Sequence, residues 1–226
     1  LGLGERPEVP AELLERWRQK LGRAPFFFYV GALRYYKGLP FLAEAARRTG
    51  LRVVVGGTGE LEAELEGIRP PYFVMLGELD EADKEALLAL CQAFVFPSHL
   101  RSEAFGVSLL EAARAGKPMI TCEIGTGTSY VNVHGETGLV VQPADADALG
   151  AAMQSMATSP DAAAMGERAR ARYDALFTAG EMTRAYRALY DKLHVAHSQG
   201  LACGTTDERP PAFPVFVKPR VNLKGM

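Results

Sequence analysis

Two glutamates with seven residues between them, Glu103 and Glu111, are the side chains whose types and spacing most clearly suggest a binding site. Apolar residues at helical spacing predict a helix over residues 107–115, with Glu103 at its mouth and Glu111 inside it. With Glu111 about one and a half turns inside the helix, a rise of about 1.5 Å per residue would place the two carboxylates roughly 8–10 Å apart. Carboxylates accept hydrogen bonds from hydroxyl groups, and the free N–H groups at a helix start attract phosphate. The pair therefore favours a ligand with hydroxyl groups on both sides of a diphosphate.

Two cations lie in a short loop nearer the start of the chain. Arg34 and Lys37 follow a buried apolar run, and Lys37-Gly38 opens a predicted helix. The next apolar run ends in the glycine-rich loop Gly56-Gly57-Thr58-Gly59, in which Gly57 would let the backbone approach a ligand closely. These loops favour a nucleoside diphosphate that carries a sugar, with the cations against its phosphates.

The elements that must position these loops are strands of a parallel sheet. Six short runs are nearly continuous in apolar residues, as expected for strands that are buried on both faces. They cover residues 26–31, 51–56, 72–76, 93–97, 118–122 and 138–141. Because helical patterns separate the runs, we expect a Rossmann-like α/β fold, a doubly wound parallel sheet of about six strands with helices on both faces. Ligands of such sheets bind beyond the carboxyl ends of the strands, where the candidate loops lie.

The same pattern predicts the domain organisation. Residues 1–24 are expected to form an inter-domain lead with one helix, and residues 25–195 the α/β domain with a helical C-terminal extension. Residues 196–226 read as a tail, either irregular or the start of a truncated segment. Since the chain begins at Leu1 and ends just after an apolar run at 215–217, we interpret it as a piece of a longer polypeptide.

Several helix boundaries have recognisable signals. Asp80 is placed to cap a helix over residues 81–91. After residue 141 only helices are predicted, with starts marked by Asp145 and Pro160. Gly180 is expected to separate the last two helices.

Composition excludes several classes of function. With 25 Lys and Arg against 27 Asp and Glu, the net charge of −2 argues against a general nucleic-acid binder. No apolar run approaches the roughly 18 residues needed to cross a bilayer. Cys91, Cys122 and Cys203 are far apart and odd in number, which predicts reduced, mostly buried thiols and a cytoplasmic location. The arginines of the late helices suit a solvated face, or alternatively peripheral membrane contact or domain docking.

Three familiar loops do not fit this chain. Gly57-x-Gly59 has Glu62 where a dinucleotide-binding fingerprint needs its third glycine. Gly116-Lys117 continues with Pro118, so it does not form a Walker A loop. No Gly-x-Ser-x-Gly nucleophile elbow is present.

The segment from Glu103 to Ala112 resembles the signature of retaining GT-B glycosyltransferases, and more closely that of glycosyltransferase family 4. Further segments agree with that family in order and spacing. They are Tyr29-Val30-Gly31 with Lys37-Gly38, Val53–Gly59, Leu76-Gly77, Phe96-Pro97-Ser98, Ala115-Gly116-Lys117-Pro118 and Gly135-Glu136-Thr137-Gly138-Leu139-Val140. The resemblance covers roughly residues 25–195, the C-terminal, nucleotide-sugar half of the two-domain fold.

The resemblance implies a role for each candidate residue. Glu103 would hold hydroxyls of the donor sugar, Glu111 the ribose hydroxyls, and Lys37 the leaving phosphates. The backbone N–H groups implied to contact the sugar and diphosphate are those of Phe105, Gly106 and Val107. The residues implied to lie near the base are Gly77, Glu78 and Leu79. The family transfers a sugar with retention and usually without a metal, so neither a metal nor a cofactor is expected. The implied partners are a glycan or lipid-linked acceptor and an absent N-terminal domain, which carries the acceptor site and usually a catalytic histidine.

Two positions depart from the family pattern. The family commonly has arginine five residues before the lysine, where this chain has Ala32, and Arg34 is our candidate for the missing cation. The loop Gly125-Thr126-Gly127-Thr128-Ser129-Tyr130 replaces the more usual Gly-Gly-x-x-Glu. This loop and the stretch from Leu33 to Gly38 resemble bacterial mannosyltransferases of surface-polysaccharide assembly, which makes GDP-mannose the first candidate donor. The alternatives are a nucleotide-sugar-binding module that no longer catalyses, favoured by Ala32, and the less favoured Rossmann dehydrogenase.

Overall fold

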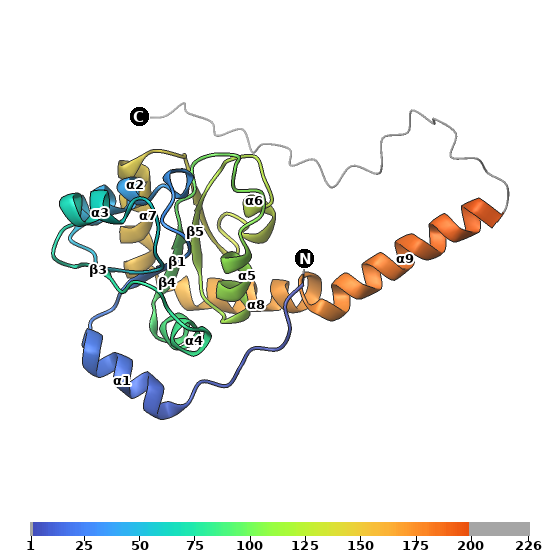
Figure 1. Cartoon of the computed structure of the whole chain (residues 1–226), viewed down its shortest axis with the longest axis horizontal. Coiled ribbons are helices and arrows are strands. Elements are labelled where there is room, and N and C mark those ends of the chain that lie inside the picture. The colour runs from blue at the N-terminus through green and yellow to red at the C-terminus, as the bar shows by residue number, and fades with distance from the viewer. Residues whose placement is uncertain (1, 199–226) are drawn as a thin grey trace. The chain divides into compact units, whose positions relative to one another are not determined.

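The computed structural model describes residues 2–198 (Figure 1). The chain divides into two units, one up to Met182 and one from Thr183 onward, and each is described by itself. The predicted tail beyond residue 198, with Cys203 and the apolar run at 215–217, lies outside the described residues. The predicted division at residues 24 and 195 therefore stays a prediction.

Six strands form one sheet in which every neighbouring pair is parallel. They are β1 (Phe27–Val30), β2 (Val53–Gly56), β3 (Phe73–Met75), β4 (Ala93–Phe96), β5 (Met119–Cys122) and β6 (Gly138–Val141). Each strand lies within one of the six predicted apolar runs, so the predicted parallel sheet is confirmed.

The strand order is β3-β2-β1-β4-β5-β6, so the chain reverses its direction of travel across the sheet between β1 and β4. These two strands are neighbours, with Phe27 opposite Ala93 and Phe28 opposite Phe94. In open α/β sheets, ligands commonly bind at such a switch point, beyond the carboxyl ends of the strands. The loop after β1 carries Lys37 and the loop after β4 carries Glu103, so the topology brings both to this edge.

Helices cover both faces of the sheet, as the right-handed connections require (Figure 1). They are α1 (Ala11–Leu21), α2 (Leu39–Thr49), α3 (Glu62–Ile68), α4 (Glu81–Leu90), α5 (Val107–Arg114), α6 (Thr128–Val131), α7 (Ala146–Thr158), α8 (Ala162–Leu176) and α9 (Ala179–Ser198), with a 3-10 turn at Tyr35–Lys37. On one face α2 packs against α7; on the other α5 packs against α8, and α1 against α4. Within residues 2–198, the helices all lack the combination of length and apolar character that crossing a bilayer requires.

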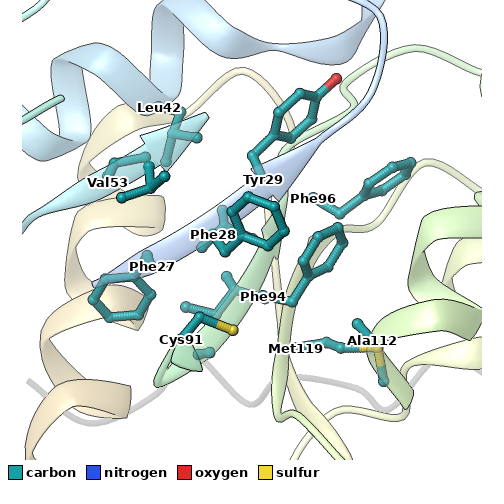
Figure 2. Packing of buried hydrophobic residues seen from close by; sticks show 14 of the residues in the cluster. Phe27, Phe28, Tyr29, Leu42, Val53, Cys91, Phe94, Phe96, Ala112 and Met119 are labelled. Atoms are coloured by element: carbon teal, nitrogen blue, oxygen red, sulfur yellow. The ribbon is translucent and has the colours of Figure 1, made fainter. Parts of the chain in front are cut away.

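The core is built around β1, whose Phe27, Phe28 and Tyr29 are fully buried between the two helical layers (Figure 2). The Phe28 and Phe94 rings meet edge to face, with centroids 6.2 Å apart. Burial of each such side chain contributes about 1.5–3 kcal/mol. The core holds the strands whose ends carry the site.

The two described cysteines are buried and unpaired, as predicted. Burial raises the pKa of the Cys91 thiol to about 11. Burial also raises the pKa of the Cys122 thiol to about 12, and the negative charge of Asp145 adds to this shift. Both therefore fill the core as neutral thiols.

The boundary between α8 and α9 differs from the prediction. α8 ends at Leu176 and α9 begins at Ala179, so Gly180 lies inside the first turn of α9 instead of separating the two helices. The break is made by Thr178, whose Oγ1 accepts a hydrogen bond from the backbone N–H of Glu181 at 3.1 Å. A hydroxyl in this position caps a helix start and needs no glycine.

The predicted cap of α4 is present and can be tested. The Asp80 carboxylate accepts a hydrogen bond of 2.7 Å from the backbone N–H of Asp83. Because its loss leaves a helix N–H unpaired, we expect Asp80→Ala to lower the free energy of unfolding by about 1 kcal/mol in urea denaturation. Asp174→Ala, which removes an exposed ion pair with Arg170, is the control and should cost less than about 0.5 kcal/mol. Equal effects of the two substitutions would contradict the capping role.

Candidate functional site

The structure brings Lys37 and Glu103 into direct contact, although they are 66 residues apart in the chain. The ammonium group of Lys37 forms an ion pair with the Glu103 carboxylate, and the two side chains are only 13% and 11% exposed. Ser98, two residues after the end of β4, donates a hydrogen bond of 3.2 Å to the same carboxylate oxygen. A cation and a carboxylate thus neutralise each other at the carboxyl ends of neighbouring strands.

Aromatic side chains surround this ion pair. The Lys37 ammonium lies 5.1 Å from the ring centroid of Tyr36 and 5.0 Å from that of Phe96. The buried Tyr29 hydroxyl donates a hydrogen bond of 3.1 Å to the backbone oxygen of Ala32. Burial raises the pKa of Tyr29, and the negative charge of Glu103 adds to this shift. Such surroundings strengthen charge interactions, because little water screens them.

The loops after β1 and β4 touch through their backbones. Gly38 has φ +71°, and a side chain there would collide with the backbone oxygen of Pro97. His99 is 9% exposed, with the rings of Tyr35 and Phe41 edge to face at centroid distances of 5.1 and 5.2 Å. Burial lowers the pKa of His99, which favours the neutral imidazole. The close approach of the loops requires glycine at position 38.

Glu111 forms a second ion pair, which the sequence did not predict. The Lys84 ammonium on α4 lies 2.7 Å from a carboxylate oxygen of Glu111 and 2.7 Å from one of Glu81. The Lys84 and Glu111 side chains are each 15% exposed. Lysine is a common helix residue, and the spacing of 27 positions between the partners follows no motif, so only the packing of α4 beside α5 reveals the contact.

The start of α5 offers unpaired backbone donors. Among residues 2–198, no acceptor is found for the N–H groups of Phe105, Gly106 and Val107. Gly106 directly precedes the helix and has φ +85°. Glu103 lies four residues before the first residue of α5, and Glu111 is the fifth residue of α5. Free N–H groups at a helix start carry partial positive charge and can bind an anion.

The loops after β2 and β3 meet at the edge of the sheet as well. The Gly57 N–H donates a hydrogen bond of 2.6 Å to the backbone oxygen of Gly77, and both residues have positive φ. A side chain at position 57 would collide with the backbone oxygen of Gly31. Leu79 packs against the backbone of β2, and Glu78 is exposed. The backbone of Gly57 and Gly77 therefore lies at this part of the edge, together with the side chains of Glu78 and Leu79.

Neither Arg34 nor the cavity near the N-terminal segment takes part in these contacts. The Arg34 side chain is exposed and makes no hydrogen bond or ion pair with any described residue. A cavity of about 690 Å³ contains none of the predicted site residues. Its lining comes from the N-terminal segment, the end of α5, α8 and the start of α9, and includes Arg6, Arg114 and Tyr173.

Acidic side chains that could suggest a metal site have structural partners. In the Asp145-Ala146-Asp147 sequence, Asp145 accepts a hydrogen bond of 2.9 Å from the Ala148 N–H, and Asp147 pairs with Arg48. Across the described range 2–198, we find no group of three or more His, Cys, Asp or Glu residues placed to hold a metal ion.

Relatives with known names match much of this chain. D-rhamnosyltransferase WbpZ from Pseudomonas aeruginosa is 54% identical over 180 residues, 76% of this chain and 46% of that protein. O-antigen chain mannosyltransferase C from Escherichia coli is 45% identical over 190 residues, 81% of this chain and 50% of that protein. The chain therefore spans about half the length of these curated relatives.

Comparison of structures gives the same fold. HepE from Anabaena, solved in complex with UDP-glucose, superposes with a TM-score of 0.70 at 20% identity, over 81% of this chain and 54% of that one. Residues 14–172, most of the chain, match the family described as Glycosyl transferases group 1. With the parallel sheet, the paired carboxylates and the open start of α5, this match shows that the chain belongs to the group 1 glycosyl transferases.

Proposed function

We propose that this chain is the C-terminal, donor-binding half of a retaining GT-B glycosyltransferase of family 4. The observation that carries the proposal is the Lys37–Glu103 ion pair at the carboxyl ends of the neighbouring strands β1 and β4. Of the sugar nucleotides, we propose GDP-mannose as the donor, because the segments 33–38 and 125–130 resemble mannosyltransferases and one relative is named a mannosyltransferase.

The diphosphate would bind between Lys37 and the start of α5. Two kinds of positive group are available there, the Lys37 ammonium and the unpaired N–H groups of Phe105, Gly106 and Val107. A phosphate oxygen that takes Lys37 as its partner releases the Glu103 carboxylate, which then accepts hydrogen bonds from the sugar hydroxyls. These groups can balance the phosphate charge, so we propose that the reaction needs no metal or cofactor.

The nucleoside would lie along the opposite end of the site. Glu111 accepts hydrogen bonds from the ribose hydroxyls, and the base lies against Gly77, Glu78 and Leu79. Gly57 would contribute its backbone to this end of the site, and the backbone oxygen of Gly31 occupies the space that a side chain at position 57 would need.

In the proposed reaction, the bond between the sugar and the diphosphate breaks and the acceptor oxygen bonds to the same sugar carbon from the same face. The hydroxyl proton passes to the leaving phosphate oxygen. The reaction needs no nucleophile from the protein. Lys37 and the α5 N–H groups stabilise the negative charge that grows on the leaving phosphate, and because they are already in position they need little reorganisation. The acceptor, a glycan or a lipid-linked saccharide, would be held by the N-terminal half of the protein.

A binding module without catalysis is the second candidate function. The observation that favours it is Ala32, which stands where the family commonly has a cation, with the replacement candidate Arg34 exposed and unpaired among the described residues. Tight donor binding by a full-length protein that transfers no sugar would identify this case. The presence of Glu103, Glu111 and Lys37 favours a catalytic protein over a binding module.

A thermal-shift screen of GDP-, UDP- and ADP-sugars tests the proposed function. A ligand that binds only the folded state raises the free energy of unfolding, by about 2.7 kcal/mol when its concentration is 100 times Kd. The melting temperature rises as a result. We expect the largest rise with GDP-mannose, unchanged by EDTA. No rise with any sugar nucleotide would overturn the proposal, and a rise that EDTA removes would overturn its metal-free part.

Glu111→Gln is expected to weaken GDP binding about tenfold, or about 1.4 kcal/mol, in isothermal titration calorimetry. An amide accepts a weaker hydrogen bond from ribose hydroxyls than a carboxylate does. Glu66→Gln, an exposed carboxylate on α3, is the matched control and should leave GDP binding unchanged. Unchanged binding by Glu111→Gln would remove the ribose assignment.

A further inference from the structure

The contact between Lys84 and Glu111 joins α4 to α5 beside the proposed ribose site. We infer that Lys84 is a positioning residue, which holds one oxygen of the Glu111 carboxylate so that the other faces the ribose hydroxyls. The inference rests on the proposed function, because it assumes that a nucleoside binds at Glu111.

Burial is the first argument for this role. The Glu111 side chain is only 15% exposed, so water cannot fully solvate its charge. A partly buried carboxylate without a cation is costly, and a side chain that is free to rotate would lose entropy when it binds a ligand. The Lys84 ammonium lies 2.7 Å from the carboxylate oxygen, so it offsets the cost of burying the charge. It also restricts the Glu111 side chain beforehand, which reduces the entropy lost on binding.

The asymmetry of the two Lys84 contacts is the second argument. Glu81 is 61% exposed and lies three residues before Lys84 on the same helix, so this contact alone would be an ordinary surface pair. Lys84 itself is only 15% exposed, because its side chain also reaches across to Glu111 on the neighbouring helix. Lys84 therefore loses its hydration through the contact with Glu111, the residue proposed to bind the ribose.

The charge of Lys84 is stable in this position. Burial lowers the pKa of Lys84, but its hydrogen bonds to Glu111 and Glu81 outweigh burial, and the net pKa lies above the ordinary value. Lys84 is thus a permanent cation at neutral pH. It donates to one oxygen of Glu111 and leaves the remaining lone pairs as acceptors.

The test separates positioning from a simple link between α4 and α5. Calorimetry compares GDP with 2′,3′-dideoxy-GDP, which lacks the ribose hydroxyls. Lys84→Met should weaken GDP binding about tenfold, the lower end expected for a hydrogen bond that involves a charged group. The same variant should change dideoxy-GDP binding less than about twofold, since no hydroxyl remains for Glu111 to accept. Lys84→Arg should restore GDP binding to within about threefold, because it keeps the charge.

A matched control is available in Lys117, which lies between α5 and β5 and contacts the same helix α4. Lys117 is partly buried, and its ammonium binds the backbone oxygens of Ala89 and Cys91, at and just beyond the far end of α4, at 2.8 Å each. Lys117→Met should lower stability and leave GDP affinity unchanged. Equal loss of GDP and dideoxy-GDP binding in Lys84→Met, or no loss of either, would overturn the inference and leave the proposed function in place. Failure of the unaltered chain to bind GDP, UDP or ADP would overturn the proposed function, and the inference with it.

Discussion

Lys37→Ala is expected to lower kcat of the proposed sugar transfer by the full-length protein about 10²–10³-fold, and to weaken GDP binding less than about tenfold. The proposed role of Lys37 is to stabilise charge that grows on the leaving phosphate, so its loss acts mainly on the transition state. The aromatic rings of Tyr36 and Phe96 line the position of the ammonium, and its 13% exposure limits replacement by water. Initial rates with GDP-mannose, together with calorimetry, measure the two effects separately.

The control for this substitution is Lys20→Ala. Lys20 lies on α1 over the Trp17 ring, at 4.6 Å from its centroid, and has no place in the proposed site. It should leave both kcat and GDP affinity unchanged. A kcat within threefold of the unaltered enzyme, or a loss of GDP affinity as large as the loss of kcat, would contradict the role given to Lys37.

Glu85→Ala is expected to lower the free energy of unfolding by about 3–5 kcal/mol. Glu85 is 1% exposed and pairs with Arg114 at the end of α5, which is 6% exposed. Its second oxygen accepts a hydrogen bond of 2.8 Å from Arg6. Removing the carboxylate would leave the Arg114 charge buried without its partner. Arg6, with a side chain 23% exposed, can turn toward water.

Urea denaturation of a double variant checks this explanation. Glu85→Leu combined with Arg114→Met removes both buried charges, so it should be less destabilising than Glu85→Ala alone. The Arg114 guanidinium also donates to the backbone oxygens of Gly4 and Glu5, at 3.2 and 3.3 Å, so part of the loss should remain. A loss below about 1 kcal/mol in Glu85→Ala, or a double variant that is less stable than it, would contradict the buried-charge explanation.

The strands were predictable because burial on both faces leaves a local mark. Runs such as 26–31 and 93–97 are apolar throughout, and their lengths match buried parallel strands. The cap at Asp80 was predictable for the same reason, since a side chain three residues from its partner is a local feature. The predicted helix boundary at Gly180 was wrong because both a glycine and a capping threonine favour a break. The Thr178 hydroxyl, two positions earlier, caps the start of α9.

The candidate site was predictable only in part. The seven residues between Glu103 and Glu111, and the nearby glycines, are local patterns, and the family match agrees with the resemblance they carry. The partners of these glutamates are not local. Lys37 meets Glu103 across 66 residues, and Lys84 meets Glu111 across 27.

By itself, the sequence determined which segments are strands, which loops follow them and which charged side chains those loops carry, because burial and backbone preference act on neighbouring residues. The tertiary structure alone decided that β1 lies beside β4 and α4 beside α5, and so which cation faces which carboxylate. The physical reason is that an ion pair depends on distance in space, and the strand order converts separation along the chain into contact at one edge of the sheet.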